Sequence, residues 1–102
     1  MAFPDYMNEV EQRIVGNLIR KALTQGLLVS VFDGEEWPLK RSADIDQITE
    51  QVAATDITTL RFFRTVEDKQ VRVGDVLLVH GNEDDVIGDH TDNEIMEELC
   101  RQ

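Results

Sequence analysis

Cysteine is nearly absent from this sequence, and so are the features that direct a chain to a membrane or out of the cell. Cys100 is the only cysteine, so no disulfide can form within the chain. The first residues, Met1 to Asp5, lack the positive start and apolar run of a signal peptide. The longest apolar run, Val76 to Val79, is far shorter than the roughly 20 residues that span a bilayer. We therefore expect a cytoplasmic protein without a membrane partner.

Positive charge is also scarce. Ten Lys and Arg residues stand against 21 Asp and Glu residues, which gives a net charge of -11. A field of that sign repels polyanions, and this argues against nucleic acid as a direct partner. The imbalance is concentrated near the C-terminus, because residues 81–102 hold eight acids and one base, whereas residues 1–80 hold thirteen acids and nine bases.

Motifs for nucleophilic catalysis and phosphate binding are missing. The sequence has no G-x-S-x-G, and its six glycines are scattered rather than gathered in a phosphate-binding loop. Cys100 falls on a short terminal helix where a cysteine normally serves as a small apolar filler or is an exposed thiol. We expect no catalytic residue, no cofactor and no enzymatic activity.

Metal ligands are few. His80, His90 and Cys100 are too few and too dispersed for a structural zinc site. The calcium loop of an EF-hand is excluded because an apolar residue, Ile87, falls on a ligand position. A looser divalent-metal or hydrolytic site in the acidic loop remains the alternative hypothesis. Its residues are Asp84, Asp85, Asp89 and His90.

What the sequence does contain is the pattern of one folded domain, residues 1–102, with 41% hydrophobic and 30% charged residues. Apolar residues at spacings of three and four predict a helix from Tyr6 to Gln25. Ser42 is the predicted cap of a second helix over 43–54. A capping box formed by Thr91 and Glu94 predicts a short terminal helix.

Five short segments between these helices are typical of strands, being rich in β-branched and aromatic residues. A turn at 33–36 uses Gly34, and Gly74 predicts a β-bulge. The order α-β-β-α-β-β-β-α predicts an α+β fold with a largely antiparallel sheet of four to five strands and helices on one face. The predicted strands are Leu27–Phe32, Trp37–Lys40, Thr58–Val66, Val71–His80 and Val86–Ile87.

The aromatic residues allow two interpretations. Bases and phenylalanines interleave over 61–64, a pattern also found on nucleic-acid-binding sheets. The net charge favours the other interpretation, with Phe62 and Phe63 in the core and Arg61 pointing outward. Trp37, the single tryptophan, is either a core residue or a surface aromatic at an interface.

Four short stretches together resemble a group of small, uncharacterised proteins encoded in bacteriophages and prophages. The resemblance covers about residues 14 to 95 and implies a bacterial or phage cytoplasmic setting. It implies no activity, cofactor or catalytic residue. The stretches are Val31–Trp37, Thr55–Asp56, Val79–Asn82 and Val86–Asn93.

These observations lead to a functional prediction, a non-enzymatic protein-binding accessory module that acts through its acidic C-terminal surface. Clustered carboxylates can complement a basic partner, and in the extreme case they mimic a nucleic acid. The same acids can also serve solubility alone, and the choice between monomer and homodimer stays open. The residues predicted to contact the partner are Glu83, Asp84, Asp85, Asp89, Asp92 and Trp37.

Overall fold

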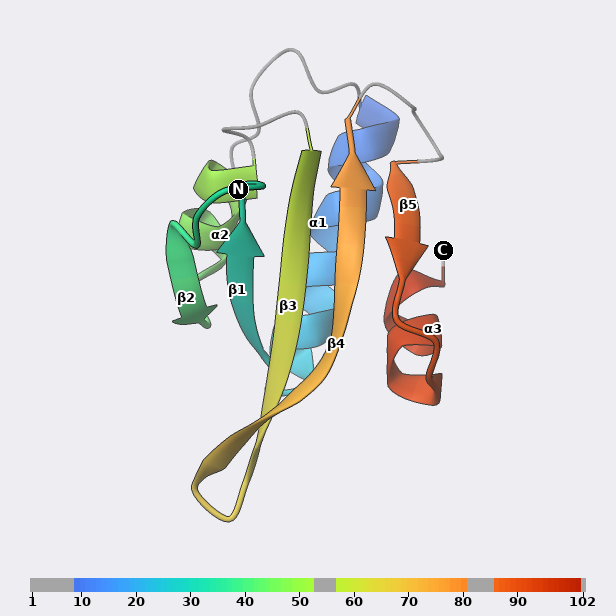
Figure 1. Ribbon diagram of the computed structural model, residues 1–102. Helices are drawn as coiled ribbons and strands as arrows, with labels where there is room; N and C mark the ends of the chain where they lie inside the picture. The colour runs from blue at the N-terminus through green and yellow to red at the C-terminus, as the bar shows by residue number, and fades with distance from the viewer. Residues whose placement is uncertain (1–8, 53–56, 81–85, 102) are drawn as a thin grey trace.

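A five-stranded antiparallel sheet with strand order β2-β1-β3-β4-β5 forms the centre of the molecule (Figure 1). The computed structural model describes residues 9–52, 57–80 and 86–101. Its element order confirms the α+β prediction. The elements are α1 (Glu9–Thr24), β1 (Leu28–Phe32), β2 (Leu39–Ser42), α2 (Ile45–Val52), β3 (Ile57–Val66), β4 (Lys69–Val79), β5 (Ile87–His90) and α3 (Glu94–Cys100).

The helices lie on one face of the sheet, as the sequence predicts. In Figure 1, α1 and α2 lie behind the strands, while α3 lies at the edge formed by β5. In β3 and β4, alternate residues point toward the helices and are buried, because successive side chains of a strand face opposite ways; in β1, Ser30 on the other face is buried as well. The opposite face carries no described helix. The core side chains of the three central strands are Val29, Val31, Leu60, Phe62, Val76 and Leu78.

The second helix starts later than the sequence predicts, and its cap is a different residue. The carboxylate of Asp44 accepts hydrogen bonds from the backbone N–H groups two and three residues further on, at 2.9 and 3.3 Å. Asp44 therefore caps α2. Ser42 instead ends β2, where its hydroxyl accepts the N–H of Asp44 at 3.0 Å. The prediction of Ser42 as the helix cap was wrong by two residues.

The predicted capping box of the last helix is also wrong. Asn93 is the N-cap of α3, and its side-chain oxygen accepts the N–H of Met96 at 2.9 Å. Thr91 has another partner, because its hydroxyl accepts the N–H of Asp75 at 2.9 Å. The backbone N–H of Thr91 donates to the carbonyl of Asp75 at the same distance. Thr91 therefore ties the end of β5 to β4 rather than starting the helix.

The boundaries of the short strands shift by one to three residues. The returning strand begins at Leu39 and not at Trp37, but its position at a sheet edge is confirmed. The last strand is Ile87–His90 instead of Val86–Ile87. Gly34 has the positive φ, 104°, predicted for the 33–36 turn. The start of the predicted first helix and the turn at Thr55–Asp56 lie outside the described residues.

The predicted β-bulge at Gly74 is confirmed. Phe62 pairs with Gly74 and the next residue of β3 pairs with Arg72, so one residue of β4 is extra. Gly74 is buried beneath α3, and a Cβ there would lie 2.6 Å from Cγ of Met96. The missing side chain therefore lets α3 pack directly on the sheet.

Candidate binding site

The helix-free face of the sheet, called the open face below, carries a polar row across three strands. Ser30 pairs with Arg61, and Arg61 pairs with Asp75, so these side chains share one side of the sheet. Phe63 points to the same side as Arg61 and is half-buried. The prediction that Phe63 lies in the core was therefore wrong, because alternation along β3 leaves only Phe62 inside.

A hollow of ≈ 450 Å³ opens on this face over β1, with residues of β2 and β3 on either side. That volume falls within the range of roughly 300–1,000 Å³ that is usual for ligand sites. We call it the cationic groove, because half of its lining residues carry positive charge. The lining residues are Ser30, Trp37, Lys40, Arg41, Arg61 and Phe63.

An irregularity in β2 places two of these cations side by side. The β1–β2 register shifts so that Lys40 and Arg41 together lie opposite Ser30, which is the pattern of a β-bulge. Arg41 adopts the left-handed conformation, with φ of 51°. The hydroxyl of Ser30 accepts the backbone N–H of Arg41 at 2.9 Å and holds the bulge in place. Such a backbone conformation at a non-glycine residue persists only where the surrounding structure holds it, as the Ser30 hydrogen bond does here.

The two aromatic rings of the groove each lie beneath a guanidinium group. Arg41 lies 5.0 Å from the ring centroid of Phe63, and Arg61 lies 4.8 Å from that of Trp37. Trp37 also contacts Phe32, with the ring centroids 4.9 Å apart. These distances are those of cation–π and aromatic pairs. Trp37 is thus half-buried on the open face and does not belong to the core.

Arg61 is fixed from the opposite direction by Asp75. Its Nε and Nη2 donate to the two carboxylate oxygens at 2.8 and 3.1 Å, and Arg72 adds a contact to the same carboxylate at 2.7 Å. The hydrogen bond to Asp75 raises the pKa of Arg61, against the opposing effect of partial burial. Arg61 is therefore held between a carboxylate and an indole ring.

Lys40 and Arg41 differ from Arg61 in their charge partners. Within residues 9–52, 57–80 and 86–101, no carboxylate lies within ion-pair distance of either side chain. Both residues are exposed to solvent. In a chain with a net charge of -11, the groove thus concentrates positive charge that the described acids do not neutralise.

The predicted acidic surface lies at the other edge of the sheet. Asp89 pairs with Leu77 on the open face, and Asp92 follows β5; both are exposed. Neither is brought near Trp37, which lies beside β2 at the opposite edge. The predicted contacts Glu83, Asp84 and Asp85 lie outside the described residues. We use the name acidic edge for the exposed residues Asp89, Asp92, Glu94, Glu97 and Glu98.

The alternative metal site is only partly described. Asp84 and Asp85 are outside the described residues, while Asp89 and His90 follow each other in β5. The carboxylate of Asp89 accepts the backbone N–H of His90 at 2.9 Å, and Nδ1 of His90 lies 2.9 Å from the carbonyl oxygen of Thr91. Among the residues that the structure describes, no three His, Cys, Asp or Glu side chains are placed to hold a metal. The metal hypothesis stays a prediction.

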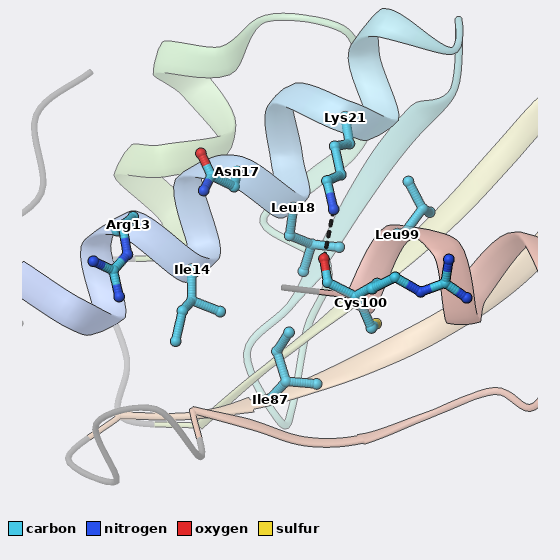
Figure 2. A pocket seen from close by; sticks show the side chains of 9 residues that line it. Arg13, Ile14, Asn17, Leu18, Lys21, Ile87, Leu99 and Cys100 are labelled. Carbon is cyan, nitrogen blue, oxygen red and sulfur yellow. Dashed lines mark hydrogen bonds between the residues drawn. The ribbon is translucent and has the colours of Figure 1, made fainter.

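A second hollow, of ≈ 340 Å³, lies between α1 and α3 (Figure 2). Its wall includes the apolar side chains of Leu18 and Leu99, and Nζ of Lys21 donates to the carbonyl of Arg101. Burial raises the pKa of the Cys100 thiol here to about 11, against a smaller opposing effect of Lys21. A thiol with that pKa is almost wholly protonated at neutral pH and is a poor nucleophile.

Sequence reasoning missed most of the cationic groove. It noted the alternation of Arg61 and Phe63 with their neighbours, which was the one available signal, but gave the net charge more weight. Lys40 and Arg41 gave no signal, because neither their shared position opposite Ser30 nor their nearness to β3 can be read from local sequence.

Comparison with known proteins adds no relative. No family model, no curated protein and no solved structure matches the chain. The resemblance to phage and prophage proteins therefore stays a prediction. Of the helices that the structure describes, none is long and apolar enough to cross a membrane.

Proposed function

We propose that this chain is a non-enzymatic protein-binding module that contacts its partner through the open face of its sheet. One observation carries the proposal: the cationic groove combines a tryptophan, a phenylalanine and two arginines on a face that no described helix covers. Tryptophan and arginine are the residues most enriched at the energetic centres of protein interfaces. Trp37 is the expected anchor of the contact.

The chemistry of the groove supports binding rather than catalysis. Ser30 carries the only hydroxyl among the six lining residues, and that oxygen accepts the backbone N–H of Arg41. The cations Lys40, Arg41 and Arg61 donate hydrogen bonds and have no neighbouring general base within this lining. The groove is thus suited to hold an anionic or aromatic group without transforming it.

The acidic edge has a supporting role in this proposal. Exposed carboxylates at β5 and α3 contribute a long-range field that speeds the approach of a partner with a basic surface. Asp89 lies on the open face, so a partner large enough to cross the sheet can contact it together with Trp37. A phage or prophage accessory protein of a bacterial host is the setting that we propose.

The test compares partners captured by three forms of the tagged chain from a nuclease-treated bacterial lysate. The wild-type chain is expected to retain a specific protein, and Trp37→Ala is expected to lose most of it, since removal of such an anchor costs about 2 kcal/mol or more. Circular dichroism establishes that the variant is folded.

The matched control is Asp89→Asn/Asp92→Asn, which removes charge at the acidic edge and leaves the groove intact. It is expected to retain the same protein, with slower association and a weaker dependence on salt. The proposal fails if Trp37→Ala retains every protein that the wild type captures.

A further inference from the structure

We infer that the cationic groove binds an extended segment of a partner protein that is rich in aspartate and glutamate. The inference rests on the proposed function and specifies the chemistry of its partner. It depends on three features of the described residues: uncompensated positive charge, rings already covered by guanidinium groups, and a β-bulge at the sheet edge.

Charge complementarity supplies the first argument. Lys40, Arg41 and Arg61 line the groove, and Asp75 is the one carboxylate bound to any of them among the described residues. Arg72 contacts that same carboxylate. Arg61 and Arg72 therefore share a single acid, while Lys40 and Arg41 pair with none of the described carboxylates. In a partner whose basic surface approaches the acidic edge, a separate carboxylate-rich segment would be attracted to the groove and repelled by the acidic edge, which fixes where that segment binds.

The aromatic rings favour a carboxylate partner over a nucleic acid. Sheets that bind single strands present aromatic rings on which bases stack. Here Arg41 covers Phe63 and Arg61 covers Trp37, so a stacking base would have to displace a guanidinium group. Carboxylates instead accept hydrogen bonds from the edge of a guanidinium and leave its stacking intact. The net charge of -11 also opposes a polyanion such as DNA.

The β-bulge determines how such a segment lies. β2 is an edge strand, and an edge strand can pair with an added strand. A bulge and an edge lysine both prevent this pairing, and β2 has the bulge at Lys40 and Arg41 as well as the lysine itself. Both side chains point over the open face beside Ser30. The segment therefore crosses the face of the sheet and does not extend its edge.

The experiment uses Trp37 as its own probe, because it is the single tryptophan of the chain and lines the groove. Its fluorescence is followed during titration with a short glutamate-rich peptide, with the same peptide carrying glutamine in place of glutamate, and with oligothymidylate. We expect a saturable change with the glutamate peptide that weakens as salt is raised. The glutamine peptide and oligothymidylate are expected to give no saturable change.

Two double variants distinguish binding of the peptide in the groove from a general effect of the net charge of the chain. Lys40→Gln/Arg41→Gln removes the two cations without a described acidic partner and should weaken the glutamate peptide about ten- to a hundredfold. Arg20→Gln/Lys69→Gln removes the same charge from exposed positions outside the groove lining and should leave binding nearly unchanged. Circular dichroism checks the fold of both.

Three results would overturn the inference. They are equal binding of the glutamate and glutamine peptides, equal weakening in both double variants, and preferential binding of oligothymidylate, which would indicate a nucleic-acid site. The result that would contradict the proposed function is a different one. If Trp37→Ala loses the captured protein while the glutamate peptide does not bind, the open face is still the contact surface and only the acidic partner is wrong.

Discussion

The cationic groove and the acidic edge lie at opposite ends of one sheet, and they differ in how their charges are held. In the groove, a β-bulge, two aromatic rings and a bidentate ion pair fix the positions of Arg41 and Arg61. At the acidic edge, Asp89 and Asp92 are exposed, and the one ion pair there among the described residues, between Glu98 and Arg101, is exposed as well. Packing organises the first set of charges, whereas solvent surrounds the second.

This difference shows why net charge is a poor guide to a binding surface. A total of -11 correctly describes the long-range field of the chain. It does not describe the field inside the groove, because exposed charges are largely screened beyond the Debye length of roughly 8 Å in physiological salt and the nearest charges therefore dominate. Residues of the less abundant charge therefore indicate a candidate binding surface where the fold brings several of them together.

The largest effect on stability is expected from a substitution that disturbs the packing of α3, which carries part of the acidic edge, against the sheet. Gly74→Ala places a Cβ 2.6 Å from Cγ of Met96 and 2.9 Å from Cβ of Thr91. We expect this overpacking to lower the free energy of unfolding by about 1–3 kcal/mol, measured by urea denaturation.

The matched control is Gly88→Ala in β5. Its nearest neighbour would be Cγ2 of Val79 at 3.3 Å, and Gly88 is exposed, so a smaller loss is expected. Equal unfolding free energies for the two variants would show that close packing of α3 on Gly74 is not what joins the acidic edge to the sheet.

An intermediate effect on stability is expected at acid pH, in the turn that leads to the groove residue Trp37. The Asp33 carboxylate accepts the backbone N–H groups of Glu35 and Glu36 at 2.9 and 2.7 Å, in the turn that leads to Trp37. These bonds, to Glu36 first, lower the pKa of Asp33 below 3.8. Their stabilising effect is present above pH 3.8 and is lost as the pH falls through the lowered pKa.

Trp37 fluorescence across an acid titration checks this expectation. The wild type should show a transition below pH 3.8 that is reduced in Asp33→Asn, whose side chain does not titrate. Superimposable curves for the two proteins would mean that the turn does not depend on the charge of Asp33.

The smallest effect on stability is expected at alkaline pH and concerns Cys100 in α3. The pKa of Cys100 is about 11 against an ordinary value of 9.0, because burial disfavours the thiolate. Its stabilising contribution is complete below pH 9.0 and is lost as the pH rises through about 11. Cys100→Ala should lack this loss and should differ little from the wild type in its pH dependence near neutrality.

Thiol modification kinetics provide the measurement. The rate for Cys100 should be slow at neutral pH and should keep rising up to about pH 11. A rate that levels off near pH 9.0 would contradict the effect of burial.

Much of the fold follows from the sequence because its signals are local. The apolar periodicity around Ile14 and Leu18 gives α1, the alternation around Leu60 and Phe62 gives β3, and Gly74 marks the β-bulge. The caps were predicted less well. Ser42 and Thr91 are good capping residues by type, but the Ser42 hydroxyl accepts the N–H of Asp44 ahead of the helix, and the Thr91 hydroxyl accepts the N–H of Asp75 in β4.

The sequence by itself therefore determined the elements, their order and the acidic character of the chain. Only the tertiary structure decided that Trp37, Arg41, Arg61 and Phe63 meet in one groove. The physical reason is that this meeting depends on strand order, on the β1–β3 register and on a bulge held by Ser30. Each of these is a relation between distant segments, and a one-residue change of register would turn the same side chains to the opposite face.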